Sequence, residues 1–299
     1  MPPSDPTRAP ADLAADCAVE RLTAAPGWYT ALLPPSWSFR TPSGGVLMSV
    51  ALRAMRAELD DPEFPLVSAT TLFCSPVPDG PLEIRVEVLR RGGAAAQLRA
   101  MLSSTTLPGP GLEVSATFAR KRAGIDVVGA EFPDVPMPAD ALPMDEDAPG
   151  NPHTYYPFFR NFECRHADGP RWWIPGWSAG PARHGRWFRY RAPQLGADSL
   201  LDPLAIPPIA DTMPPALISA VGPTDQRLRA PSLDLTVHFL ESTRSQWLLA
   251  RSYARRAWDG YASAEIEIWS DERRLVAFAT QTMMLRGGAT APTKSPENR

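Results

Sequence analysis

The sequence has few cysteines, and their spacing excludes two kinds of cross-linked protein. Only Cys17, Cys74 and Cys164 occur among 299 residues, and no two of them have the C-x-x-C spacing. An odd number at this spacing fits neither a disulfide framework nor a zinc site built on paired cysteines. Three free thiols fit a reducing compartment, so we expect a cytoplasmic protein that holds no structural metal.

The sequence also lacks a basic excess and a long apolar run. Its 30 Lys and Arg are balanced by 33 Asp and Glu, which leaves a formal charge of −3. Binding to nucleic acid or to an anionic membrane favours clustered basic residues, so neither partner is expected. No uninterrupted run of about 18 apolar residues occurs, and the first residues, MPPSDPTRAPADL, lack the basic-then-apolar pattern of a signal peptide. We therefore expect no membrane span and no signal peptide.

Proline, in contrast, is abundant, and its distribution divides the chain. Ten of the 35 prolines lie within residues 123–181, a stretch without helical or strand periodicity but rich in Tyr, Phe and Trp. So many aromatic side chains indicate a connection that packs on a domain surface. Residues 1–20 and 288–299 are rich in polar residues and proline and are expected to be mobile. The predicted organisation is a tail at 1–25, a first unit at 26–122, the connection at 123–181, a second unit at 182–287 and a tail at 288–299.

Each of the two units has one helical pattern followed by short strands. In the first, Gly44 and Gly45 open an apolar 3.6-residue pattern that ends at Leu59. In the second, Asp211 precedes Pro214 and Pro215, which predicts a helix that begins at Asp211. Alternating or β-branched runs bounded by turn residues predict antiparallel strands at 66–73, 82–91, 95–104, 112–120, 187–191, 232–240, 247–256, 261–270 and 274–286.

The two units align with each other at an offset of 166 residues. Pro65 matches Pro231, Thr70 matches Thr236, Leu82 matches Leu248 and Arg85 matches Arg251. The helix openings, Gly45 and Asp211, have the same offset. A three-residue shift in the last hairpin then aligns Phe118 with Gln281. A helix followed by an antiparallel sheet, repeated once, predicts an α+β fold of two related units.

Three stretches of the second unit resemble the type II acyl-CoA thioesterase family, namely IPPIADTMPPAL (206–217), PSLDLTVHFL (231–240) and RRLVAFATQTMMLR (273–286). The resemblance extends over about 26–122 and 182–287. It implies a double hotdog fold, in which each of two tandem units has a central helix wrapped by a curved antiparallel sheet. It also implies an acyl-CoA substrate, as in lipid metabolism, and assembly as a homodimer or a higher homo-oligomer.

The same resemblance implies a catalytic trio of Asp211, Ser232 and Gln281. In the family an Asp, a hydroxyl residue and a Gln hold the water that hydrolyses the thioester, with the Asp as general base and without a metal or redox cofactor. The hydroxyl residue is often Thr in the family, whereas this chain has Ser232.

Each member of the trio also has a simpler interpretation. Asp211 could cap its own helix, Ser232 could be a turn hydroxyl, and Gln281 could face solvent on an alternating strand. The aligned positions in the first unit are Gly45, Leu66 and Phe118. Because all three polar groups are missing together there, we interpret the second unit as the catalytic one and the first as a partner that shapes the acyl site.

Three other functions compete with this prediction. The first is a protein of the same fold that binds acyl-CoA or acyl chains without turnover. The second is a hotdog hydratase, which needs an Asp five residues before a His, a spacing that none of the four histidines has. The third is a serine hydrolase that uses Ser178 in the G-x-S-x-G motif at 176–180, with His238 in its chain order. Pro175 and Pro181 flank that motif and predict a loop instead of a strand–turn–helix.

Overall fold

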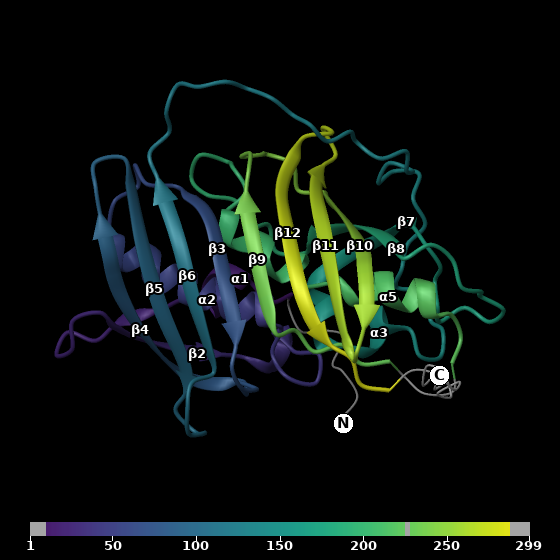
Figure 1. Ribbon diagram of the computed structural model, residues 1–299, viewed down its shortest axis with the longest axis horizontal. Helices are drawn as coiled ribbons and strands as arrows, with labels where there is room; N and C mark the ends of the chain where they lie inside the picture. Colours follow the sequence, from purple (N-terminus) through teal and green to yellow (C-terminus); the bar gives the residue numbers. More distant parts are fainter. Residues whose placement is uncertain (1–9, 225–227, 288–299) are drawn as a thin grey trace, which may run out of the picture.

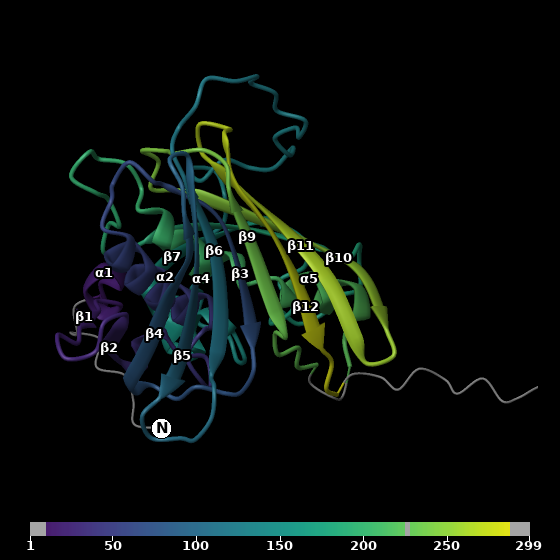
Figure 2. The same cartoon turned by 60° about the vertical axis from the view of Figure 1, so that its left-hand side comes forward.

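The computed structural model describes residues 10–224 and 228–287, and its main feature is one 12-stranded sheet. The strand order is β1-β2-β4-β5-β6-β3-β9-β12-β11-β10-β8-β7, and all neighbouring pairs are antiparallel. The helices lie on one face of this sheet (Figures 1 and 2). After β6 the chain arches over the end of the sheet to reach the second unit (Figure 1).

The strands are β1 Glu20–Arg21, β2 Trp28–Leu33, β3 Leu66–Phe73, β4 Gly80–Arg91, β5 Ala95–Ser104, β6 Leu112–Ala119, β7 Phe162–Asp168, β8 Arg183–Tyr190, β9 Asp234–Phe239, β10 Leu248–Trp258, β11 Tyr261–Ser270 and β12 Leu275–Met284. The helices are α1 Leu13–Asp16, α2 Gly44–Leu59, α3 Pro152–Tyr155, α4 Ile206–Ala210 and α5 Pro214–Val221, with single-turn 3-10 helices at η1 Pro35–Trp37, η2 Pro157–Asn161 and η3 Pro203–Ala205.

Strands β3 and β9 join the two units at an approximate two-fold axis. The first six strands of the sheet mirror the last six, so that β3 corresponds to β9, β6 to β12 and β5 to β11. Thr70 and Thr236 are register partners across this junction, and their hydroxyl oxygens lie 3.0 Å apart. Their separation is the repeat offset of 166. Antiparallel strands run in opposite directions, so equivalent residues can face each other only on the axis, which therefore passes between these two threonines.

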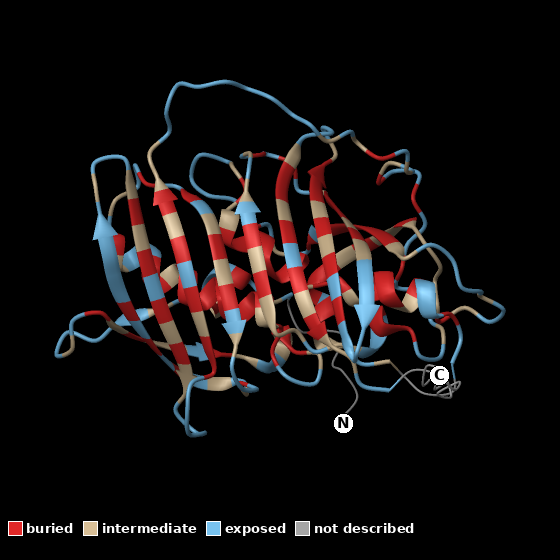
Figure 3. Ribbon diagram, in the orientation of Figure 1, coloured by how far each residue is buried: buried red, intermediate tan, exposed pale blue. Residues whose placement is uncertain are grey.

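This arrangement confirms the predicted α+β double hotdog fold. In the first unit, α2 packs against the sheet with its apolar residues buried, among them Val46, Met48 and Val50 at 0 % exposure. Figure 3 shows the matching alternation of buried and more exposed residues along the strands. In β6, Leu112, Val114, Ala116 and Phe118 face the core. That period of two is what a sheet with one covered face requires.

The second helix differs from its prediction. Asp211 does not begin a helix, because it follows the last residue of α4 as its C-cap, and its N–H donates to the carbonyl oxygen of Pro207. The chain turns at 211–213, and α5 then begins at Pro214. Pro214 and Pro215 have no N–H to donate to the preceding turn, and a proline disfavours helical conformation in the residue before it. The two prolines therefore interrupt the helix at the position where Asp211 lies.

The connection and the N-terminal residues contain more structure than the sequence indicates. Residues 162–168 form β7, which pairs with β8 at the edge of the second unit. As predicted, aromatic residues of the connection pack on the core, since Phe158, Phe162 and Trp173 are at most 6 % exposed. Within the tail predicted to be mobile, α1 is ordered and buries Leu13 completely. Residues 1–9 and 288–299 lie outside the described residues.

One helical stretch, Pro203–Val221, is long and apolar enough to cross a membrane, with a mean hydropathy of 1.3. The window that meets this criterion is 78 % buried inside the protein. It comprises η3, α4 and α5, which pack beside α2 and the second half of the sheet. A core helix passes the same test, so the stretch is weak evidence for a span.

Candidate active site

Asp211, Ser232 and Gln281 lie in direct contact, although 21 and 49 residues separate them along the chain. The Ser232 hydroxyl donates to Oδ1 of Asp211 at 3.1 Å. Nε2 of Gln281 donates to the same Oδ1 at 2.6 Å and to Oγ of Ser232 at 2.7 Å. The three groups therefore form a closed hydrogen-bonded triangle around one carboxylate oxygen.

Each side chain reaches this triangle from a different element. Asp211 lies in the break between α4 and α5, Ser232 just precedes β9, and Gln281 lies on β12. Ser232 forms an isolated bridge with Met283, which fixes the start of β9 against β12. Gln281 faces inward at 1 % exposure, so the solvent-facing alternative is wrong. Its Oε1 is buried and has no hydrogen-bond partner among the described residues.

The other carboxylate oxygen of Asp211 is bound by the first unit. Oδ2 accepts from the N–H of Gly45 at 3.0 Å and from the hydroxyl of Ser43 at 3.2 Å. Ser43 occupies the N-cap position of α2, but its side chain makes no capping bond. Asp211 of the second unit instead satisfies a free N–H of the first turn of α2. Asp211 therefore does cap a helix, but the helix is α2 of the first unit and not the one that follows Asp211 in the sequence.

The sequence did not reveal this contribution of Ser43. A Ser next to two glycines at the predicted start of a helix is an ordinary N-cap signal. The only available indication was that Gly45 and Asp211 align at the repeat offset of 166, which near a two-fold axis places equivalent residues close together. The first unit therefore supplies hydrogen bonds to the trio.

Burial raises the pKa of Asp211 above its usual value, because the carboxylate loses solvation. The hydrogen bonds from the Gly45 N–H, Gln281, Ser232 and Ser43 favour the charged form and partly offset this effect. Asp211 as a whole keeps partial contact with solvent. The site thus holds a carboxylate that is more basic than an exposed one.

The sequence alignment of the two units is wrong at one of the three positions equivalent to the trio, namely the match of Phe118 with Gln281. In the first unit Thr70 pairs with Ser115, and its equivalent Thr236 pairs with Thr280. In the same way Leu98 pairs with Ala116, and its equivalent Ala264 pairs with Gln281. The equivalent of Gln281 is therefore Ala116, so the last hairpin departs from the repeat offset of 166 by one residue and not by three. Ala116 is 4 % exposed and carries no polar group. The conclusion that only the second unit has the polar trio holds with Gly45, Leu66 and Ala116 as the equivalents.

We expect Ser43→Ala to move the acid limb of the activity profile to higher pH. The substitution removes one of the hydrogen bonds that lower the pKa of Asp211, so the carboxylate becomes protonated at a higher pH. Activity on the plateau should change by less than about tenfold, since three hydrogen bonds to the carboxylate remain. The check is the pH dependence of kcat/KM, with Ser115→Ala on the exposed side of β6 as the control. An unmoved acid limb would contradict a role of Ser43 in this ionisation.

The G-x-S-x-G motif lies in the loop between β7 and β8, as its flanking prolines predicted. No strand precedes Ser178 and no helix follows it directly, and the residue is exposed. The N–H of Gly180 donates to the carbonyl oxygen of Ser219 and so ties the loop to α5. His238 is exposed on β9. The strand–turn–helix geometry of a nucleophile elbow is therefore missing.

Metal binding is not indicated by the side chains that the structure describes. Within residues 10–224 and 228–287, no group of three or more His, Cys, Asp or Glu is arranged to hold a metal ion. The described thiols are all free, with Cys17 and Cys164 buried and Cys74 exposed.

Two family models match the chain, one in each unit. Residues 33–119 match the acyl-CoA thioesterase N-terminal domain, and residues 137–285 match the acyl-CoA thioesterase C-terminal domain. The C-terminal match begins inside the proline-rich connection and includes β7. No curated protein matches the sequence.

Solved structures with low sequence identity share the fold over nearly their whole length. A hot dog fold protein from Alicyclobacillus acidocaldarius is 20 % identical with a TM-score of 0.76, and the alignment covers 93 % of this chain and 98 % of that one. The acyl-CoA thioesterase II TesB2 from Mycobacterium marinum is 21 % identical with a TM-score of 0.68, covering 92 % and 98 %. The tesB protein of Mycobacterium avium subspecies paratuberculosis is 18 % identical with a TM-score of 0.71, also covering 92 % and 98 %.

Proposed function

The chain belongs to the acyl-CoA thioesterase family, and we propose that it hydrolyses an acyl-CoA thioester to the free acid and CoA, using water activated by Asp211, Ser232 and Gln281. The observation that carries the proposal is the closed triangle of these three side chains around Oδ1 of Asp211. A buried carboxylate of raised pKa suits the task of deprotonating a water molecule.

In this mechanism Asp211 is the general base. The water oxygen attacks the thioester carbonyl carbon while one of its protons passes to the Asp211 carboxylate. When the tetrahedral intermediate collapses, the C–S bond breaks and the sulfur leaves as the thiolate of CoA. The proton on Asp211 then passes to that sulfur, which restores the carboxylate. No bond to the protein forms at any step and no oxidation or reduction occurs, so the proposed route uses no redox cofactor. We also propose that it uses no metal, because Asp211 supplies the base.

The other two members orient the reactants. Nε2 of Gln281 donates to both Asp211 and Ser232 and so holds the two groups against each other. Ser232 fixes the rotamer of the carboxylate by its hydrogen bond to Oδ1. We assign stabilisation of the oxyanion to the N-terminus of α2, whose positive end already faces the Asp211 carboxylate through the Gly45 N–H.

We further propose that the protein acts in the cytoplasm as a homodimer or higher homo-oligomer. The sheet ends at strands β1 and β7. The two-residue β1 pairs on one side with β2, whereas residues 142–144 cover part of the outer side of β7, where the Met144 N–H donates to the Cys164 carbonyl oxygen and the His166 N–H donates to that of Leu142. Open edges are usually covered or paired with another strand, and a second copy of the chain is one such partner.

The test is release of free thiol from a panel of acyl-CoA esters of different acyl length and shape. We expect hydrolysis of at least one ester, and we expect Ser178→Ala to leave that rate unchanged because Ser178 lies in an exposed loop. The exposed thiol of Cys74 also reacts with thiol reagents, so an enzyme blank without ester is needed.

The alternatives give distinct outcomes in the same assay. Measurable binding of esters without any thiol release would favour the non-catalytic binding protein. Loss of activity in Ser178→Ala would favour the serine hydrolase, and hydration of an unsaturated ester without cleavage would favour the hydratase.

A further inference from the structure

Phe73, the last residue of β3, lies beside the Asp211 carboxylate although it belongs to the first unit. A Cβ built on Gly44 would lie 2.6 Å from two carbons of the Phe73 ring and 3.2 Å from Oδ2 of Asp211. The ring and the carboxylate therefore border the same methyl-sized position. Phe73 thus places an apolar side chain next to the proposed general base.

The side of the trio that Phe73 borders is also the less buried one. Gln281 and Ser43, which both donate to the Asp211 carboxylate, are only 1 % and 2 % exposed. Ser232, Gly44 and Phe73 are each partly exposed. An ester that enters from solvent therefore meets the trio at these three residues, and the ring is the large apolar group among them.

The backbone of Phe73 is held on both sides. Its N–H donates to the carbonyl oxygen of Leu233 at 2.9 Å, and Leu233 directly follows Ser232. On its other side Phe73 pairs in register with Leu112 of β6. β3 thus ends where β9 begins (Figure 1). With the backbone fixed, the ring moves only about its two side-chain torsions and forms a firm wall.

The repeat supplies a second phenylalanine in an equivalent place without the trio. Phe239 matches Phe73 at the offset of 166, and it is also partly buried against the core. It lies at the far end of β9 from Ser232, roughly 20 Å away along the chain direction. The first unit has Leu66 where the second has Ser232, so that end of the sheet has no polar trio. Phe239 is therefore a matched control for Phe73.

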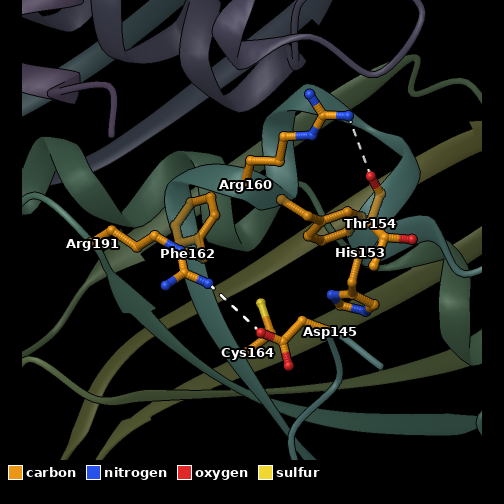
Figure 4. A pocket seen from close by; sticks show the side chains of 8 residues that line it. Asp145, His153, Thr154, Arg160, Phe162, Cys164 and Arg191 are labelled. Atoms are coloured by element: carbon orange, nitrogen blue, oxygen red, sulfur yellow. Dashed lines mark hydrogen bonds and ion pairs between the residues drawn. The ribbon is translucent and has the colours of Figure 1, made fainter. Parts of the chain in front are cut away.

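A cavity of about 250 Å³ lies elsewhere, between α3, η2 and β7 (Figure 4). Its lining residues include Asp145, Arg160 and Arg191, and none of them belongs to the trio or to β3. Charged walls do not favour an apolar chain. The first carbons of an acyl group must in any case lie next to the base, where Phe73 borders the site.

We propose that Phe73 determines acyl specificity and that its ring excludes acyl groups branched at C2, an inference that rests on the proposed hydrolysis. A water at hydrogen-bond distance from the base attacks a carbonyl carbon about 3–3.5 Å away, which places that carbon within roughly 6 Å of the carboxylate. C2 is one bond further, in the region that the ring borders. A methyl branch on C2 meets the ring, whereas an unbranched chain passes along its face.

The test compares octanoyl-CoA with 2-methyloctanoyl-CoA as substrates of the full-length protein. The wild type should favour the straight ester about tenfold or more in kcat/KM, the effect of one methyl group in a closely fitting site. Phe73→Ala should remove most of this preference and raise the KM for octanoyl-CoA, and Phe73→Leu should remove part of it. Phe239→Ala should keep the wild-type ratio. A merely structural loss would lower both rates together and leave the ratio unchanged.

Binding of thioethers separates this inference from the proposed function. Octyl-CoA and 2-methyloctyl-CoA have no carbonyl group to hydrolyse, and calorimetric titration should show the same preference and its loss in Phe73→Ala. If no ester is hydrolysed but this binding pattern is found, only the thioesterase proposal fails. The specificity role is overturned by a wild type that does not favour the straight compounds, by a ratio that Phe73→Ala leaves unchanged, or by an equal change in Phe239→Ala. The kcat/KM ratio decides where esters are hydrolysed. Where they are not, the binding ratio decides, and absence of binding of both thioethers also overturns the role.

Discussion

Replacement of Asp211 by Asn is expected to lower kcat for thioester hydrolysis by about 10²–10⁴, the usual contribution of a general base. Asn has nearly the same shape but cannot take a proton from water. The substrate contacts that do not involve the base remain, so KM should change little. The measurement is thiol release under saturating ester, with Asp234→Asn as the matched control. Asp234 accepts from the N–H of Thr282 through Oδ1, an interaction that Asn can keep.

The free energy of unfolding, measured against pH, shows whether Asp211→Asn is folded and so separates a catalytic effect of the substitution from unfolding. The folded-state pKa of Asp211 is raised by burial, so the folded protein binds this proton more tightly than the unfolded chain. The ionised form therefore costs stability at neutral pH, and the cost disappears as the pH falls through the raised pKa toward the unfolded value. Relative to Asp211→Asn, the wild type should gain free energy of unfolding on acidification. Nearly wild-type hydrolysis by a folded Asp211→Asn protein would contradict the proposed base.

Replacement of Gly45 by Ala is expected to destabilise the fold and the site together. A Cβ at this position would lie 2.1 Å from the carbonyl oxygen of Pro207 and 2.8 Å from Cα of Pro208. Both are backbone atoms, so α2 and α4 must move apart. Overpacking of a core typically costs about 1–3 kcal/mol and occasionally more, and we expect the upper part of that range. Moving α2 also displaces the Gly45 N–H from Asp211, so kcat should fall about tenfold or more.

Two neighbouring substitutions make this experiment specific. Gly93→Ala in the turn between β4 and β5 is the control, because a Cβ there meets nothing within 4 Å. Gly44→Ala places a Cβ 2.6 Å from the ring of Phe73, which is a side chain, and 3.2 Å from Oδ2 of Asp211. Its loss of stability should therefore be smaller and should be relieved by Phe73→Leu, whereas no side-chain change relieves Gly45→Ala. The measurements are thermal unfolding and thiol release. Equal stability of Gly45→Ala and Gly93→Ala would contradict the close packing of α2 on α4.

The sequence predicted the strands of the two units well because a sheet with one covered face imposes a period of two. Strands 66–73, 95–104 and 261–270 have the predicted bounds, and α2 ends at Leu59 as its pattern indicates. The missed elements have weaker local signals. Strand β7 lies within residues 123–181, where its seven residues alternate too briefly to distinguish a strand from a connection. Helix α1 has four residues, which is too short for a helical period to show.

Residue type and spacing were enough to show that two related units make up the chain and that the second has an Asp, a Ser and a Gln where the first has no such trio, because a repeat is visible in the sequence. They could not show that Asp211 lies in a helix break, that Ala116 is the equivalent of Gln281, or that Ser43 and Gly45 of the first unit bind the carboxylate. Those contacts join residues up to 168 positions apart. They depend on the two-fold axis between Thr70 and Thr236, which brings the starts of two sequence-distant helices together, and no local pattern encodes such a distance.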